Sequence, residues 1–270
     1  KNAQDWGDLA RWPKAAWDLI KDLDYASLLT SRGCPLRCPY CASHLLFSGW
    51  QQRGPQALLD EILSLHRQRG IRDFAFHDDA LLMGPDKPLA EALEVLARMD
   101  LGLRFHCPNG LHVKAIDSHW ARLMKRAGFV TLRLGVESSA SDPALFGEKS
   151  DMAAFLLAME NLRSAGFDGG QIGAYLLAGL PGQAVEEVAR SVEAVASAGA
   201  LPFISEYSPV PGTATFEQAR AISSFNLDEP LFHNNSFFAC RRDEFSLEHL
   251  AALKKCAQEK RALVRRSSRA

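Results

Sequence analysis

The chain has 270 residues, with 31 Lys and Arg against 32 Asp and Glu, and a formal net charge of −1. Apolar residues make up 47% of it, enough to build a core, which excludes a mainly disordered protein. The near-zero charge gives no long-range attraction to nucleic acid or to an anionic membrane, so we expect neither as a partner. No apolar run approaches the roughly 18 residues of a spanning helix.

Short apolar runs alternate with longer amphipathic stretches along the chain. The runs, each bounded by Gly, Pro or Asp, predict six buried strands: Ala26–Ser31, Ile71–His77, Leu101–His106, Val130–Val136, Gln171–Ala178 and Phe203–Tyr207. The stretches between them predict five helices: Gln56–Arg69, Lys87–Met99, Ser118–Ala127, Met152–Ala165 and Val185–Ala198.

Residues typical of helix ends stand at the expected places. A glycine follows four of the helices, as a left-handed C-cap would, at Gly70, Gly128, Gly166 and Gly199. Asp117 and Asp151 precede two helices as candidate N-caps.

Most strands follow one another at the spacing of a βαβ unit, roughly 30 residues. The sequence therefore predicts an α/β fold, a partial (β/α)6 TIM-like barrel of parallel strands with outer helices. A closed barrel would need eight strands, and two more are not evident. We expect a lead-in segment over residues 1–25, the barrel over 26–240, and a C-terminal helix (246–265) with a basic tail over 241–270.

Three of the six cysteines lie within eight residues, at Cys34, Cys38 and Cys41, whereas the other three are scattered. Three close cysteines cannot all pair with one another, so they predict a metal site in a reducing compartment, which we expect to be the cytoplasm. The C-x3-C-x2-C spacing directly follows the first predicted strand. In folds with parallel strands, the loops after the carboxyl-terminal ends of the strands commonly carry the catalytic residues.

Thiolates are soft ligands that suit iron–sulfur clusters and zinc. Three cysteines on one loop can hold three corners of a [4Fe–4S] cluster, which leaves the fourth iron open to an exogenous chelating group. The alternative is a Cys3His zinc knuckle that includes His44, three residues after Cys41. The position in a βα loop favours the cluster.

The segment TSRGCPLRCPYCAS, residues 30–43, resembles the radical S-adenosylmethionine superfamily, including the aromatic Tyr40 before the third cysteine. Further phrases in the expected order are most similar to the catalytic part of cobalamin-binding-type members. These phrases are RWPKAAWDLI, FHDDALL, LGVESSA, LLAGLPGQ and PVPGTATFEQA. Together the resemblance covers roughly residues 12–219.

The resemblance implies an enzyme whose open iron binds the amino and carboxylate groups of S-adenosylmethionine. Reductive cleavage would give a 5′-deoxyadenosyl radical, or the cofactor would serve as methyl donor. The expected activity is methyl transfer or rearrangement on a small organic substrate. An electron donor such as flavodoxin or ferredoxin is implied. The sequence holds no DxHxxG motif, so cobalamin either comes from a domain or partner outside this chain or is not used.

Cofactor roles carry over to single residues. Cys34, Cys38 and Cys41 would ligate the cluster. The family's Gly-Gly-Glu is replaced by His77-Asp78-Asp79, so either aspartate would meet the methionine ammonium, or the pair caps a turn. Ribose hydroxyls or the methionine carboxylate are expected at Glu137 and Ser138, unless Glu137 pairs with Arg133 or another basic group. The adenine would be near Tyr40, Leu180 and Tyr207, although Tyr40 could be a packed loop aromatic.

Substrate-side roles are implied for residues after the third strand. His106, Cys107 and Asn109 should point at one cavity, with Asn109 on the cofactor side and the other two catalytic. Cys107 would donate a hydrogen atom or take part in methyl chemistry, or else it is a buried small residue. Arg53, Glu206 and His44 could also face a substrate. The competing functions are a zinc-binding interaction module and a barrel that binds cluster and cofactor without turnover.

Overall fold

The computed structural model describes residues 9, 12–13, 15–47, 49–83, 88–140, 142–235 and 237–268. Lys87, the first residue of a predicted helix, lies outside them. The chain divides into two compact units. The first holds residues 1–35, 43–133 and 161–167, and the second holds 36–42, 134–160 and 168–270. This division cuts through the expected barrel over 26–240, whose boundaries stay a prediction.

The first unit contains parallel strands β1 (Tyr25–Leu28), β4 (Asp73–Phe76) and β5 (Arg104–His106), with the first part of β7 (Phe129–Glu137). Alternate residues of these strands place four phenylalanines on one face, because successive side chains of a strand point to opposite faces. Their rings lie 5.3–6.0 Å apart, at Phe74, Phe76, Phe105 and Phe129. They form the buried layer of this part of the sheet.

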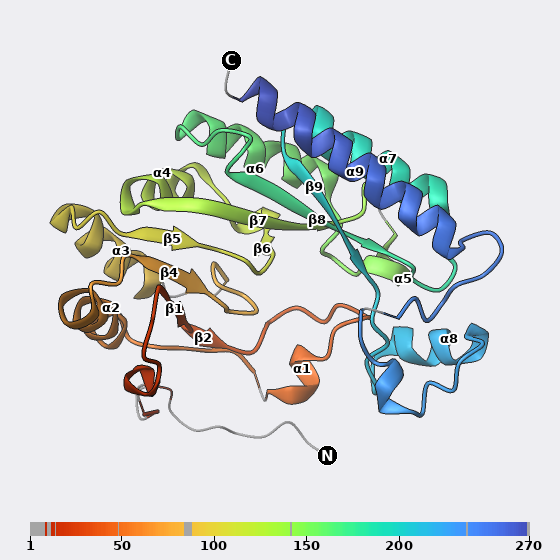
Figure 1. Cartoon of the computed structure of the whole chain (residues 1–270), viewed down its shortest axis with the longest axis horizontal. Coiled ribbons are helices and arrows are strands. Elements are labelled where there is room, and N and C mark those ends of the chain that lie inside the picture. The colour runs from red at the N-terminus through yellow and green to blue at the C-terminus, as the bar shows by residue number, and fades with distance from the viewer. Residues whose placement is uncertain are drawn as a thin grey trace. The chain divides into compact units, whose positions relative to one another are not determined.

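Three helices accompany these strands in chain order, α2 (Pro55–Arg69), α3 (Pro88–Met99) and α4 (Ser118–Ala127), and each packs on the next (Figure 1). Their ends have the predicted caps. Gly70 and Gly128 are left-handed, and the Asp117 side chain accepts a hydrogen bond from the Trp120 amide. The strand–helix alternation predicted for this half of the chain is confirmed.

The first predicted strand ends earlier than its apolar run suggests. It stops at Leu28, and the chain then turns so that β2 (Ser31–Arg32) pairs antiparallel with β3 (Gln51–Gln52). The prediction of one strand to Ser31 was wrong because an apolar run does not show where the backbone leaves the sheet. Other short elements are η2 (Trp17–Leu19), α1 (Ser43–Leu46), β6 (Leu111–His112) and η3 (Val113–Ala115).

The second unit is built on the rest of β7, on β8 (Ile172–Ala178) and on β9 (Leu201–Glu206), with β8 and β9 parallel from Gly173↔Leu201 to Ala178↔Glu206. The hydrogen-bonded strands follow the order β1-β4-β5-β7-β8-β9, and β6 pairs with β7 beside this path. This order contains the six predicted strands.

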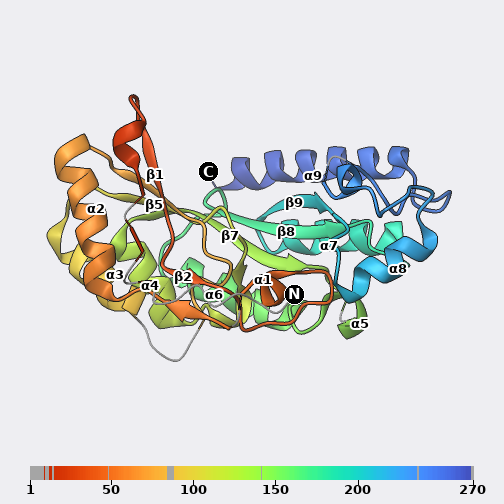
Figure 2. The same cartoon turned by 90° about the horizontal axis from the view of Figure 1, so that it is seen from below.

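Two long helices, α7 (Val185–Ser197) and α9 (Leu247–Ser267), pack on each other and on β9, as Figures 1 and 2 show. The predicted C-terminal helix is attached by Arg261, which stacks 4.8 Å over the Phe203 ring and donates to the Pro202 carbonyl at 2.8 Å. Lys254 of the same helix pairs with Glu206. That Glu206 faces a substrate stays a prediction.

The second unit also holds α5 (Pro143–Phe146), α8 (Ala214–Ile222) and η4 (Pro230–Phe232), which were not predicted, and the start of α6 (Met152–Ser164), which was. Thr213 caps α8 through its hydroxyl, which accepts from the Phe216 amide at 3.2 Å. Across the described residues, no helix is long and apolar enough to cross a membrane.

Candidate active site

Asp78 follows β4 in the first unit and is only 3% exposed. Its Oδ1 accepts three hydrogen bonds, from the Thr30 amide at 2.9 Å, the Thr30 hydroxyl at 2.7 Å and the Ser31 hydroxyl at 2.6 Å. Burial raises the pKa of Asp78, and these hydrogen bonds oppose the rise. Asp78 therefore anchors the chain just before Cys34, and its bound oxygen is committed to that segment.

Asp79, the neighbouring carboxylate, is exposed. Its Oδ2 accepts one hydrogen bond, from the Ser43 hydroxyl at 3.1 Å. Of the two aspartates predicted to meet the methionine ammonium, Asp79 is the one whose side chain is accessible. The structure thus separates two residues that the sequence left equivalent.

Gly33 places the loop that carries Cys34 against the segment at residues 47–49. It has φ +79°, and a Cβ at this position would lie 2.0 Å from the Gly49 carbonyl oxygen. Only a residue without a side chain allows this crossing.

Cys107 and Asn109 follow β5. Cys107 is 1% exposed, and burial raises the pKa of its thiol, with Asp78 adding to the rise. The Asn109 amide donates to the backbone carbonyls of His77 at 2.9 Å and Asp78 at 3.2 Å. Cys107 thus has the burial of a small packed residue, and Asn109 braces the Asp78 segment.

The side chain of His106, the last residue of β5, contacts Thr131 and Asp73. Its Nδ1 lies 3.0 Å from the Thr131 hydroxyl and its Nε2 lies 3.1 Å from Asp73 Oδ1. Asp73 also binds Arg104, whose hydrogen bond lowers the pKa of the carboxyl. The side chain of His106 thus contacts Asp73 and Thr131, whereas that of Asn109 contacts the His77–Asp78 backbone. That His106, Cys107 and Asn109 point at one cavity stays a prediction.

Cys38 and Cys41 belong to the second unit, joined by a turn in which the Cys41 amide donates to the Cys38 carbonyl at 3.1 Å. Lys149 acts electrostatically on both thiols, and its Nζ lies 2.7 Å from Glu137 Oε1. Burial alone would lower the pKa of Lys149, but Glu137 raises it overall. Burial raises the pKa of Cys38, and the Lys149 ammonium opposes that rise.

Lys149 is the site residue that the sequence prediction missed. Its side chain lies over Gly135, where a Cβ would approach Lys149 Cε to 2.7 Å. Glu137 has φ +64°, a left-handed conformation that costs energy in a non-glycine residue and is enriched at functional sites. The ion pair of Glu137 with a basic group is present, with Lys149 as the partner, and a contact of Glu137 with the cofactor stays a prediction. Lys149 follows Glu137 by twelve residues, a spacing that does not by itself predict an ion pair.

Ser138 and Leu180 belong to a hydrogen-bonded network of the second unit. The Ser138 hydroxyl donates to Glu187 at 2.7 Å. The Gln183 side-chain oxygen accepts from the amides of Gly179 at 2.8 Å and Leu180 at 3.3 Å. The amide of Leu180 is therefore used within the protein, and its side chain is fully buried.

Tyr40 and Tyr207 share an apolar cluster with Leu180, Phe146 and Leu177. Burial raises the pKa of both phenols, and for Tyr40 the nearby Glu137 and Cys38 add to the rise. The three residues predicted to be near the adenine are thus brought together, and the packed alternative for the Tyr40 side chain describes its surroundings.

In neither unit do the described residues place three His, Cys, Asp or Glu side chains as a ready metal site. Of the three clustered cysteines, Cys34 lies in the first unit, and Cys38 and Cys41 lie in the second. The three-cysteine ligand set stays a prediction.

Comparison with protein families gives a match to the Radical SAM superfamily over residues 28–195. Among curated proteins, an uncharacterized methyltransferase of Pyrococcus horikoshii is 27% identical over 117 residues, 43% of this chain and 25% of that protein. An anaerobic magnesium-protoporphyrin IX monomethyl ester cyclase of Cereibacter sphaeroides is 25% identical over 140 residues, 50% of this chain and 22% of that protein. The matches thus span about a quarter of the length of these relatives.

Among solved structures, the radical S-adenosylmethionine methyltransferase TsrM of Kitasatospora setae, with cobalamin and a [4Fe–4S] cluster bound, has a TM-score of 0.61 at 22% identity, over 74% of this chain and 38% of that one. The coproporphyrinogen III oxidase HemN of Escherichia coli has a TM-score of 0.57 at 14% identity, over 87% of this chain and 52% of that one. These similarities support the predicted α/β fold class.

Proposed function

This chain belongs to the Radical SAM superfamily, and we propose that it is an enzyme that cleaves S-adenosylmethionine reductively with a [4Fe–4S] cluster on Cys34, Cys38 and Cys41. The observation that carries the proposal is the family match over residues 28–195, which includes the three-cysteine loop directly after the first strand. The proposed reaction is methyl transfer or rearrangement on a small organic substrate.

The residues of the second unit fit such a group chemically. A cluster held by thiolates carries negative charge, which a protein interior disfavours unless a cation lies near. Lys149 is such a cation, paired with Glu137 and acting on both Cys38 and Cys41. When bound, the cluster supplies an electron and an open coordination position for S-adenosylmethionine.

The chain's own residues place and shield the cofactor in this proposal. Asp78 holds the segment before Cys34, while the exposed Asp79 is available to the methionine ammonium. Glu137 and Lys149 offer a carboxylate and an ammonium to the ribose and to the methionine carboxylate. The apolar cluster with Tyr40, Leu180 and Tyr207 offers packing to the adenine and excludes water.

Methyl transfer is favoured among the possible reactions by the names of the relatives, since the Pyrococcus protein is described as a methyltransferase and TsrM as one that binds cobalamin. We propose that cobalamin, if used, is supplied outside this chain. The proposed electron donor is a flavodoxin or ferredoxin. Cys38, Cys107, Cys240 and Cys256 are free cysteines in the structure, as suits a reducing compartment such as the cytoplasm.

The test is anaerobic reconstitution with iron and sulfide, followed by iron and sulfide analysis and by EPR of the reduced protein with and without S-adenosylmethionine. We expect about four irons per chain, as the proposed cluster type requires, and a spectrum that the cofactor perturbs. A Cys34→Ala, Cys38→Ala, Cys41→Ala triple variant should lose both. The control variant Cys240→Ala, Cys256→Ala, which removes two cysteines outside the loop, should keep both.

Other metal contents would decide against the proposal. Zinc in place of iron would support the interaction module. A cluster whose spectrum ignores S-adenosylmethionine would exclude the cleavage reaction.

A further inference from the structure

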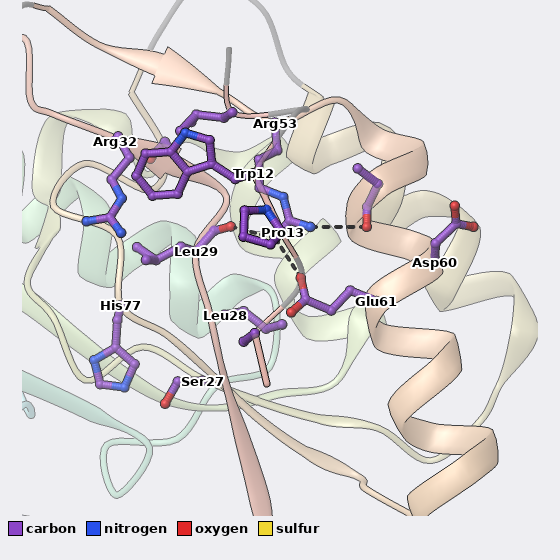
Figure 3. A pocket seen from close by; sticks show the side chains of 14 residues that line it. Trp12, Pro13, Ser27, Leu28, Leu29, Arg32, Arg53, Asp60, Glu61 and His77 are labelled. Atoms are coloured by element: carbon purple, nitrogen blue, oxygen red, sulfur yellow. Dashed lines mark hydrogen bonds and ion pairs between the residues drawn. The ribbon is translucent and has the colours of Figure 1, made fainter. Parts of the chain in front are cut away.

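The first unit contains a cavity of about 380 Å³ beside β1 and the first turns of α2. Figure 3 shows Trp12 and Pro13 over it, Arg32 and His77 toward one side, and Asp60 and Glu61 on α2 toward the other. Its volume falls in the range of small-molecule sites, about 300–1,000 Å³. None of the residues named here is a proposed ligand of the cluster or of S-adenosylmethionine.

Arg53 and Glu61 close the helix side of the cavity by binding each other. Arg53 Nη1 lies 2.6 Å from Glu61 Oε2 and donates to the Leu29 carbonyl at 3.0 Å, while Nη2 donates to the Ala57 carbonyl at 3.2 Å. The two side chains are 18% and 7% exposed. Through these contacts Arg53 links α2 to the residue that follows β1. It lines the cavity, and its role toward a substrate stays a prediction.

Arg32 lines the same cavity, but in the described part of the chain its guanidinium contacts aromatic rings rather than a carboxylate. Its guanidinium carbon lies 4.9 Å from the centroid of the Trp12 ring and 5.7 Å from that of Phe47. Among the residues that the structure describes, it makes no hydrogen bond or ion pair with a carboxylate. Aromatic contacts fix the plane of a guanidinium and leave its N–H edge able to bind a carboxylate in a bidentate manner.

The rest of the lining is suited to an apolar ligand body. Leu28 and Leu29 of the β1 end and Pro13 line the wall, and the ring of Trp12 offers a flat face. The Asp60 carboxylate accepts a hydrogen bond from Gln56 at 2.8 Å, and Glu61 is neutralised by Arg53. Among the described residues that line the cavity, Arg32 is therefore the cation for which the structure shows no carboxylate partner, and it lies next to aromatic and aliphatic side chains.

We propose that this cavity binds a small organic carboxylate with a flat apolar body, whose carboxylate pairs with Arg32 and whose body packs on Trp12 and the leucines. The site does not depend on the cluster, since every residue that forms it lies in the first unit and none is a proposed cofactor ligand. His77, exposed at the end of β4, offers a second polar contact.

The test is isothermal titration of the cluster-free protein with benzoate, naphthalene-2-carboxylate and indole-3-acetate. Each is paired with its neutral carboxamide. We expect at least one carboxylate to bind and its carboxamide to bind at least tenfold more weakly. Arg32→Gln should weaken binding of the carboxylate at least tenfold. Arg32→Lys keeps the charge but not the planar guanidinium, so its affinity should lie between those of wild type and Arg32→Gln. Arg67→Gln, on the exposed side of α2, should leave binding unchanged.

Each contrary result has a definite meaning. Failure of all three carboxylates to bind at millimolar concentration would overturn the proposal, as would equal binding by the correctly folded Arg32→Gln variant. Binding of inorganic phosphate as tight as that of the carboxylates would show that the apolar side chains do not contribute to affinity, and would overturn the proposal of a flat apolar ligand body. The triple cysteine variant should bind the probes as wild type does, so that a failed cluster assay and a failed cavity are told apart.

Discussion

Asp78→Ala is the substitution that tests most directly how the loop before Cys34 is held. It removes the one oxygen that accepts from the Thr30 amide, the Thr30 hydroxyl and the Ser31 hydroxyl, in a place where all three residues are buried. A buried donor left without an acceptor costs about 1–3 kcal/mol. The two hydroxyls can rotate toward other acceptors, but the amide cannot. Removing a buried carboxyl returns part of the loss.

We therefore expect Asp78→Ala to lower the free energy of unfolding by about 2–4 kcal/mol. Asp78→Asn keeps an oxygen for the same three donors, so its loss should be less than about half as large. Asp79→Ala is the matched control, because the Asp79 carboxylate is exposed and accepts a single hydrogen bond. Its effect should stay within about 0.5 kcal/mol.

The assay is urea denaturation of the cluster-free protein followed by circular dichroism, with amide hydrogen exchange at Thr30 as a local readout. Exchange at Thr30 should accelerate in Asp78→Ala and not in Asp79→Ala. Equal losses for the two alanine variants, or an asparagine variant as damaged as the alanine one, would refute the idea that Asp78 anchors this segment.

Three further predictions concern the same two units. Burial raises the folded-state pKa of Asp78 above an unfolded value of about 3.9. The stabilisation that this shift represents is thus complete below the unfolded pKa and is lost as pH rises through the folded pKa. The stability gap between wild type and Asp78→Asn should therefore shrink with rising pH in urea titrations, and a gap that widens would contradict the assignment. Gly33→Ala should destabilise the protein and lower iron retention well beyond Gly70→Ala. Both glycines have positive φ, but an added Cβ would clash with the Gly49 carbonyl oxygen at Gly33 and would meet open space at Gly70. Equal unfolding midpoints of the two variants would show that the chain has room at Gly33. Lys149→Met leaves Glu137 buried without its partner and should cost about 3 kcal/mol, which Glu137→Gln in the same chain should largely restore; a double-mutant cycle with additive losses would rule out the pairing.

The sequence by itself determined the features that depend on local pattern. Apolar runs and amphipathic stretches have periods that reflect the backbone of one segment, so the six strands and most helices followed from them. The caps at Asp117, Gly70 and Gly128 followed from residue identity, because only certain residues satisfy or adopt the backbone there. The three-cysteine spacing after the first strand belongs to the same class, and it led to the family.

Only the tertiary structure decided which side chains meet. Asp78 and Asp79 are adjacent in sequence, yet one is buried against Thr30 and the other is exposed. His106 faces Asp73, Arg53 is bound by Glu61, and Lys149 reaches Glu137. The physical reason is that segments distant in the chain determine whether a residue is buried, which charge it pairs with and which hydrogen-bond partners it has. The local sequence pattern does not show which distant segments come together.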